Sequence, residues 1–396
     1  MIIQPSKLSS FSIILLLLSE SIGLLSMVFP ILKGLVFLLD IGIFFVGMYL
    51  FLLIMVSLIN KNTIFIFLIL FGVLISIFII LSLNINLFGL TADGVKRSAF
   101  NIYISVFLKY LIYLGIFSFY NPSIKEFKWM KITLLIGILI PICLISESYL
   151  SINYNLFQDS SNRAWTLTYS DTLCLFTFLF YPKFYRFKNL LILLLLFSVF
   201  LVGSRTNLVI ALFVILINFL FSKKNFFRTL VYVIAILTGL LVFLNNIEFI
   251  SELVKTDHSS LSRLFDLFLS NEDLSFLERK YFEKKGVEDI INSPVFGKFG
   301  GQLYVFGITD QLSPRWGGYI HNYLSFIRQF GLIGLNLLFI YLFASFKVLK
   351  ETKLKIFIIY LLLMYFLSRS FVYPYLFIVI GLWLKQHYRY RLLFRV

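Results

Sequence analysis

Apolar runs of about 20 residues follow one another along most of the chain, and they constrain its fold more than any other feature. A helix needs roughly 20 mainly apolar residues to cross the hydrocarbon core of a bilayer. With 60% hydrophobic residues, 14% charged residues and a mean hydropathy of +0.94, the chain lies outside the range of soluble globular domains. We therefore expect an all-α, polytopic membrane protein.

The hydropathy pattern predicts about 12 transmembrane helices and one large polar loop. The expected spans are 9–30, 34–59, 63–84, 99–120, 132–149, 165–182, 189–204, 206–221, 229–246, 320–346, 356–370 and 371–384. The chain then divides into transmembrane helices 1–9 (1–246), a large extracytoplasmic loop (247–319), and transmembrane helices 10–12 with a basic tail (320–396).

The positions of the basic residues predict the orientation of the chain in the membrane, because cytoplasmic connections carry an excess of Lys and Arg. They cluster on alternate connections: Lys61; Lys125, Lys128 and Lys131; Lys183, Arg186 and Lys188; Lys223, Lys224 and Arg228; Lys347, Lys350, Lys353 and Lys355; Lys385, Arg389, Arg391 and Arg395. This pattern predicts that both termini lie in the cytoplasm. The net charge of +16 is thus a topology signal, aided by anionic membrane lipids, rather than a sign of nucleic acid as a partner.

The loop at 247–319 holds eleven of the 19 acidic residues and eight basic ones, so it lacks the positive excess of the inner connections. Its residue spacing predicts short helices at 258–270 and 274–292, followed by a turn-rich break in "NSPVFGKFGG". A loop of this length in a compact protein is usually functional or disordered. Its regularly spaced leucines, aromatics and glycines favour a folded, functional loop.

Several arginines are expected on the outer face. Arg205 lies in the tight turn of "VGSRTNLVIAL", Arg279 precedes an amphipathic segment, and Arg263 is a weaker candidate. Arg315 and Trp316 precede the tenth span. The guanidinium fork is well suited to a pyrophosphate, although a snorkelling arginine and an interfacial tryptophan are ordinary in membrane proteins.

"GGYIHNYLSFIRQFGLIG" (317–334) carries His321 and Arg328 into an apolar stretch. Imidazole titrates near neutral pH and can accept the proton of a hydroxyl, whereas the simpler interpretation is a hydrogen-bonded structural histidine. Arg328 follows two helical turns later, near the same face. Gly331 and Gly334 would allow another element to approach closely.

The "GSRT" turn, the long outer loop with "SPVFGKFG", and "HNYLSFIRQFGLIG" at a late span together resemble the O-antigen polymerase and O-antigen ligase superfamily of bacterial inner membranes. In that family the last two elements commonly read Pro-x-x-Gly-x-Gly and His-Asn-x-x-Leu-x-x-x-x-x-x-Gly-x-x-Gly. The matching positions are Pro294, Gly297, Gly300, His321, Asn322, Leu324, Gly331 and Gly334. "GKFGG" departs from the tighter glycine pattern of the family.

The resemblance implies a glycosyltransferase C-like membrane enzyme with its active site on the periplasmic side. It would polymerise repeat units carried on undecaprenyl or another polyprenyl pyrophosphate, for lipopolysaccharide or a related surface polysaccharide. It implies catalytic roles for His321 as general base and for Arg205 and Arg279 at the pyrophosphate, and substrate contacts for Arg315, Arg263, Trp316, Asn322 and Arg328. A chain-length regulator is a further candidate partner.

No metal or cofactor is expected. His258, His321 and His387 are scattered, no Asp-x-Asp pair occurs in the loop, and Cys143 and Cys174 both fall in apolar stretches.

Two other functions compete with a polymerase. An O-antigen ligase carries the same His-Asn signature and transfers the glycan to lipid A core instead. A flippase or transporter of lipid-linked sugar would fit twelve spans, with Glu20, Asp40 and Asp171 as ion-coupling groups. The long outer loop and the lack of two related halves favour an enzyme over a transporter, and the clustered arginines make a purely structural partner the weaker choice.

Overall fold

The protein is described here by a computed structural model of the 396-residue chain. The model describes residues 4–59, 88–90, 96–146, 160–183, 188–202, 204–220, 274–297, 303–305, 315–318, 320, 322–350 and 353–387, and some residues at element ends by their backbone alone.

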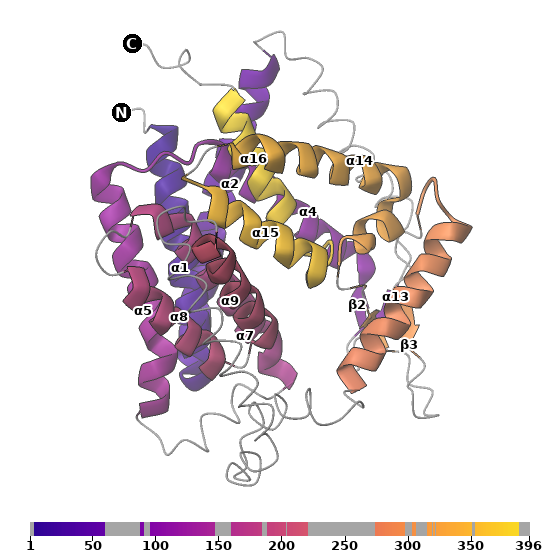
Figure 1. Ribbon diagram of the computed structural model, residues 1–396, viewed down its shortest axis with the longest axis horizontal. Coiled ribbons are helices and arrows are strands. Elements are labelled where there is room, and N and C mark those ends of the chain that lie inside the picture. Colours follow the sequence, from indigo (N-terminus) through magenta and orange to yellow (C-terminus); the bar gives the residue numbers. More distant parts are fainter. Residues whose placement is uncertain are drawn as a thin grey trace.

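Helices dominate these residues (Figure 1). They are α1 (Pro5–Val28), α2 (Lys33–Ile59), α4 (Ala99–Ser118), α5 (Ile124–Ser146), α7 (Ser160–Phe180), α8 (Lys188–Leu201), α9 (Arg205–Leu220), α13 (Leu274–Asn292), α14 (Leu324–Leu349), α15 (Lys355–Leu367) and α16 (Tyr375–His387). Short 3₁₀ turns cover Pro30–Leu32 and Tyr181–Lys183.

Two short antiparallel strand pairs accompany the helices. Strand β1 (Phe88–Leu90) pairs with β2 (Lys96–Ser98), and β3 (Leu303–Val305) pairs with β4 (Arg315–Gly318). The second pair comes from the segment expected to form the outer loop, so that segment contains strands as well as a helix.

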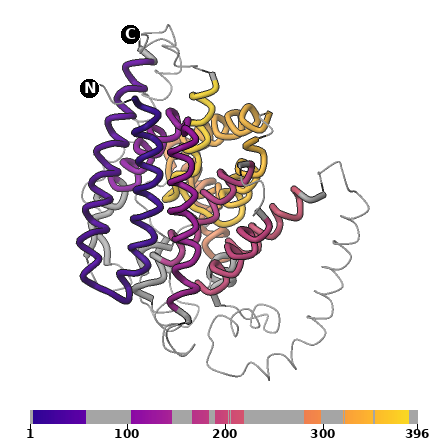
Figure 2. Tube along the Cα trace, turned by 90° about the vertical axis from the view of Figure 1, so that its left-hand side faces the viewer, coloured from indigo at the N-terminus to yellow at the C-terminus, as the bar shows by residue number. Residues whose placement is uncertain are grey.

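The helices form a bundle in which α1 packs against α2, α5 and α7, and α4 lies between α2 and α16. The first turn of α1 and the last turn of α16 lie at the same end of the bundle in both views (Figures 1 and 2). Helix α13 lies at the side of the molecule and contacts α14 (Figure 1). The large apolar core runs through α1, α2, α4, α5, α7, α8, α9, α14, α15 and α16.

Each expected span that the structure describes overlaps a helix, although 368–374 is not helical, whereas 63–84 and 229–246 lie outside the described residues. Four described helical segments are long and apolar enough to cross a membrane: Pro5–Val28, Pro30–Ser57, Ile124–Leu144 and Leu332–Leu349. Five further apolar helices are shorter. The architecture is that of a helical membrane protein, while the count of 12 crossings stays a prediction.

Large apolar side chains on the outside of these helices fit that conclusion. The side chain of Phe45 on α2 is 67% exposed and that of Phe339 on α14 is 60% exposed. Apolar surface on this scale is unfavourable in water but is what lipid chains contact. The exposed faces of α2 and α14 are therefore suited to lipid.

The predicted start of the fifth span, at 132, was too late. The main chain N–H of Ser123 donates to Glu126 Oε2 at 2.9 Å, and the Glu126 N–H donates to Ser123 Oγ at 3.3 Å. This reciprocal capping box begins α5 at Ile124, because it satisfies two otherwise unpaired N–H groups. Because of this cap, α5 begins eight residues before the predicted span.

Helices α2 and α4 approach closely at two glycines. A Cβ added to Gly115 would lie 2.6 Å from the carbonyl oxygen of Gly47, and one added to Gly47 would lie 2.6 Å from the Ile112 side chain. Small residues allow such backbone contact between membrane helices.

We expect Gly115→Ala to lower the free energy of unfolding by about 1–3 kcal/mol, because the added methyl collides with backbone atoms. Gly34→Ala is the matched control on α2: nothing lies within 4 Å of its Cβ position, so this variant should be neutral or slightly stabilising. Thermal unfolding of the detergent-solubilised variants measures both effects. Equal melting temperatures for the two variants would contradict this packing.

Candidate functional site

The turn after α13 docks onto a kink in α14, and we call this contact the glycine junction (Val295–Gly297 against Gly331–Leu332). Gly331 has φ 55° and ψ −130° inside α14, and Gly297 has φ 69°. The Leu332 N–H donates to the Val295 carbonyl oxygen at 3.1 Å. The prediction of a turn-rich break after 292 is confirmed over the described residues 293–297.

Only glycine fits both sides of this junction. A Cβ on Gly331 would lie 2.3 Å from the Val295 oxygen, and a Cβ on Gly297 would lie 2.6 Å from the Gly331 nitrogen. Both residues also have positive φ, which side chains with a Cβ rarely adopt. Two parts of the sequence signature, Pro294–Gly297 and Asn322–Gly334, therefore form one structural unit.

Helix α13, which confirms the prediction of a helix at 274–292, also contacts the residues just before α14. Ile320 is 2% exposed and packs against Phe282. The Ile320 side chain also lies so close to Gly286 that it would overlap a Cβ at that position. Asn322 Nδ2 donates to Glu283 Oε1 at 3.3 Å, and Asn322 Oδ1 accepts the Leu324 N–H at 3.0 Å. The two sequence neighbours of His321 are thus both held by α13.

A buried ion pair joins α13 to α14. Arg328 Nε donates to Asp289 Oδ2 at 2.9 Å, with the two side chains 2% and 10% exposed. The Arg328 Nη1 atom is buried and has no hydrogen-bond partner among the described residues. At least one edge of this guanidinium is therefore structural, and its contact with substrate stays a prediction.

An exposed pair lies on the same helix. Lys285 Nζ donates to Glu288 Oε2 at 2.7 Å, and this hydrogen bond raises the pKa of the Lys285 ammonium above its usual value. Because both side chains are exposed to solvent, the pair adds little to stability and serves as a comparison for buried pairs.

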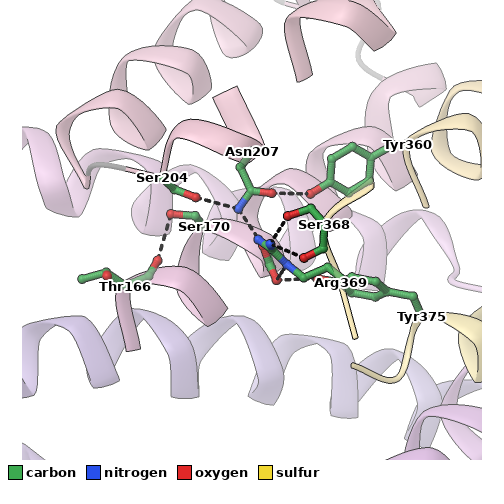
Figure 3. A network of polar contacts seen from close by, with 9 residues as sticks. Thr166, Ser170, Ser204, Asn207, Tyr360, Ser368, Arg369 and Tyr375 are labelled. Carbon is green, nitrogen blue, oxygen red and sulfur yellow. Dashed lines mark hydrogen bonds and ion pairs between the residues drawn. The ribbon is translucent and has the colours of Figure 1, made fainter. Parts of the chain in front are cut away.

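A second polar cluster lies inside the helix bundle, and we call it the buried network (Figure 3). It comes from α7, α9, α15, α16 and the connector between α15 and α16, which we define as residues 368–374. Its members are Asp171, Ser204, Asn207, Tyr360, Ser368, Arg369 and Tyr375, all described with their side chains.

Asp171 is the centre of this network. Arg369 donates to it twice, from Nε at 2.8 Å and from Nη2 at 2.5 Å. Asn207 Nδ2 and the Tyr375 hydroxyl donate to the same carboxylate, each at 2.6 Å. Arg369 Nη1 in turn donates to Ser368 Oγ at 2.6 Å. Four donor contacts and one paired charge offset the cost of burying this carboxylate.

The network also reaches the "GSRTN" turn. Asn207 Nδ2 donates to Ser204 Oγ at 3.0 Å, and Asn207 Oδ1 accepts the Tyr360 hydroxyl at 3.1 Å. The Ser204 carbonyl oxygen accepts the Leu208 N–H at 3.1 Å. Asn207, two residues after Arg205, is therefore held by α7 and α15, and it binds Ser204 in turn.

The structure describes the predicted site residues to different extents. His321 and Arg263 lie outside the described residues, as does Gly300 of the signature. Arg205 begins α9, Arg279 lies in α13, and Arg315 and Trp316 lie in β4, all described by their backbone alone. Asn322 and Arg328 are described fully, and both are bonded to α13.

Sequence reasoning missed Arg369 and Asn207 and considered Asp171 only as an ion-coupling group. The available signal was "SRS" (368–370) inside an otherwise apolar region, because an arginine within membrane segments almost always has a partner. The sequence could not name that partner, which is 198 residues away.

In the part of the chain that the structure describes, no three His, Cys, Asp or Glu side chains gather as metal ligands would. The groups that form hydrogen bonds in the buried network are guanidinium, amide, carboxylate and hydroxyl groups.

A scan against protein-family models and a search of curated proteins find no match to this sequence.

We expect Gly297→Ala to loosen the glycine junction, since the added Cβ meets the Gly331 backbone. The Leu332 amide should then exchange its hydrogen faster, which hydrogen–deuterium exchange with mass spectrometry measures on the peptide that contains it. Gly42→Ala is the control, because its Cβ would make only an ordinary 3.5 Å contact with Leu15. Unchanged exchange in Gly297→Ala would rule out the docked turn.

We expect Asp171→Asn to lower the free energy of unfolding by about 3–5 kcal/mol, because it leaves the Arg369 guanidinium buried without a counter-charge. The double variant Asp171→Asn with Arg369→Gln removes both charges and should be less destabilised. Lys285→Gln removes one partner of the exposed pair and should unfold like the wild type. These differences are read from thermal unfolding in detergent, and a double variant less stable than the single one would contradict the ion pair.

Proposed function

We propose that the protein polymerises polyprenyl-pyrophosphate-linked oligosaccharide repeat units into O-antigen or a related surface polysaccharide. It would act as a metal-independent membrane glycosyltransferase in the bacterial inner membrane, with its site on the periplasmic side. The observation that carries the proposal is the glycine junction: it joins two signature segments, on which the resemblance to O-antigen polymerases and ligases rests, into one unit, and Asn322 is bonded to the same helix α13.

The chemistry needs few groups. The hydroxyl of the acceptor sugar attacks the anomeric carbon of the donor chain, a new glycosidic bond forms, and the bond to pyrophosphate breaks. Polyprenyl pyrophosphate leaves with the electron pair of that bond. In the proposal, His321 accepts the hydroxyl proton, while Arg205, Arg279 and Arg315 hold the negative charge of the leaving group.

The remaining predicted residues would bind the glycan: Arg263, Trp316, Asn322 and Arg328. Trp316 offers an aromatic face for a sugar ring. Asn322 is already oriented by Glu283, so its amide would contact substrate from a fixed position. The acceptor and donor lipids would reach the site through the bilayer, where the exposed apolar faces of the helices lie.

One observation weighs against a transporter. The carboxylate of Asp171 is paired with Arg369 and accepts two further hydrogen bonds, so it is not available as an uncommitted ion-coupling group. Purified protein in liposomes, given lipid-linked repeat units only on the outer leaflet, separates the two functions: chain elongation supports the enzyme, and unmodified substrate crossing the bilayer supports a flippase.

Deleting the gene separates polymerase from ligase, because the two differ only in the acceptor. Loss of a polymerase leaves lipid A core that carries a single repeat unit. Loss of a ligase leaves bare core. The first result is expected here.

We expect His321→Ala to lower polymerisation roughly 100- to 10,000-fold, the range typical for loss of a general base. Arg205→Ala should abolish long polymer, and Arg205→Lys should impair it as well, because lysine keeps the charge but loses the bidentate fork. Lys285→Gln is the control, with an exposed charge removed from α13. Polymer length is read on gels with the amount of protein monitored, and full-length polymer from both alanine variants at normal protein levels would refute the mechanism.

A further inference from the structure

The connector at 368–374 is linked to the first turn of α9 through Asp171 of α7, and it contacts the first turn of α14 directly. The link runs through Arg369 and the contact through Phe371. Residue 205 is the first of α9, and α14 begins three residues after position 321. The connector is therefore tied, through one carboxylate or directly, to the first turns of the two helices on which the proposed function depends.

The link to α9 is entirely polar and passes through Asp171 of α7. Arg369 holds both oxygens of Asp171, and one of these oxygens also accepts the amide hydrogen of Asn207. Asn207 lies two residues after Arg205 and bonds to Ser204, the residue just before it. The position of Arg369 thus sets the position of the first turn of α9 through one shared carboxylate.

The contact with α14 combines a hydrogen bond with aromatic packing. The Phe371 N–H donates to Ser325 Oγ at 2.8 Å. The Phe371 ring lies edge-to-face with Phe326 and Phe330, with ring centroids 6.5 Å and 5.9 Å apart. The hydroxyl of Tyr110 on α4 donates to the carbonyl oxygen of Phe371, so α4 also binds the connector. All of these side chains are buried.

We propose that the connector is a positioning element that fixes the first turn of α9 relative to the first turn of α14, with Arg369 of the connector and Ser325 of α14 as the positioning residues. Two residues of chain span at most about 7 Å, so Arg369 and Phe371 cannot move independently. This inference rests on the proposed function where it concerns catalysis, since Arg205 and His321 would be the groups held in register. The geometric part of the inference, the position of α9 relative to α14, concerns only residues that the structure describes.

The geometric part is tested by spin labels on exposed sites of the two helices, Val209→Cys on α9 and Leu332→Cys on α14, in a background with Cys143→Ser and Cys174→Ala. Pulsed electron paramagnetic resonance measures the distance between the labels in nanodiscs. We expect one narrow distribution for the parent protein and a broader or shifted one for Arg369→Lys and for Ser325→Ala.

Ser118→Ala is the matched control, because its buried hydroxyl donates only within α4, to the Leu114 carbonyl oxygen. This control should keep the narrow distribution. If Arg369→Lys and Ser325→Ala also keep it, the connector does not position the two helices, and the inference is overturned whatever the activity of the protein.

The catalytic part is tested by elongation of lipid-linked repeat units extracted from cells that lack this gene. Misplacement by about 1 Å can lower a rate by about 100-fold, so Arg369→Lys should lower kcat by about 10- to 100-fold with KM little changed. The double variant Arg205→Lys with Arg369→Lys should lose no more kcat than the worse of the two single variants, because in the proposal Arg369 acts by positioning Arg205. A structural defect alone would lower the amount of folded protein but leave kcat per folded molecule unchanged.

The outcomes are separable. Normal kcat in Arg369→Lys and in Ser325→Ala, with an active wild type, overturns the catalytic part of the inference and leaves the proposed function standing. Absence of elongation by the wild type refutes the proposed function, and the spin-label distances still decide whether the connector positions α9 and α14.

Discussion

The ion pair between Asp171 and Arg369 is the interaction on which the rest of the helix bundle depends. Each of the two residues is about 5% exposed and lies inside the helix bundle. A charge in such surroundings is tolerated only when it is paired and hydrogen-bonded, and here Asn207 and Tyr375 complete the shell of the carboxylate. The pair therefore requires α7, α9, α16 and the connector to meet at one point, which non-directional apolar packing alone would not require.

A second constraint acts at the edge of the bundle, where α13 meets α14. The glycine junction needs two backbones within contact distance, and Arg328 with Asp289 needs two buried side chains to face each other. Both conditions hold only for one register of α13 on α14. In the proposed enzyme this register would present the segment before α14 to the substrate, while the connector would relate it to the first turn of α9.

Much of the fold could be predicted because hydropathy is a local property. Each described helix except α13 falls on an expected span, and α13 itself falls on the amphipathic segment at 274–292. Boundaries were less predictable where capping rather than hydropathy decides them, as Ser123 and Glu126 show for α5. The site was predicted in part: the signature glycines Gly297, Gly331 and Gly334 are packing positions, whereas Arg369 was not predicted because its importance depends on a partner far away in the sequence.

The sequence by itself determined the class of protein, the helical segments, the polar segment between them and the order of the signature residues. These follow from apolar run length, charge placement and glycine spacing, which are all read within a few tens of residues. Only the tertiary structure decided that Gly297 faces Gly331, that Asp171 neutralises Arg369, and that Phe371 packs on the start of α14. The physical reason is that burial of a charge and close contact between backbones depend on surroundings built from distant segments, and no local pattern specifies those surroundings.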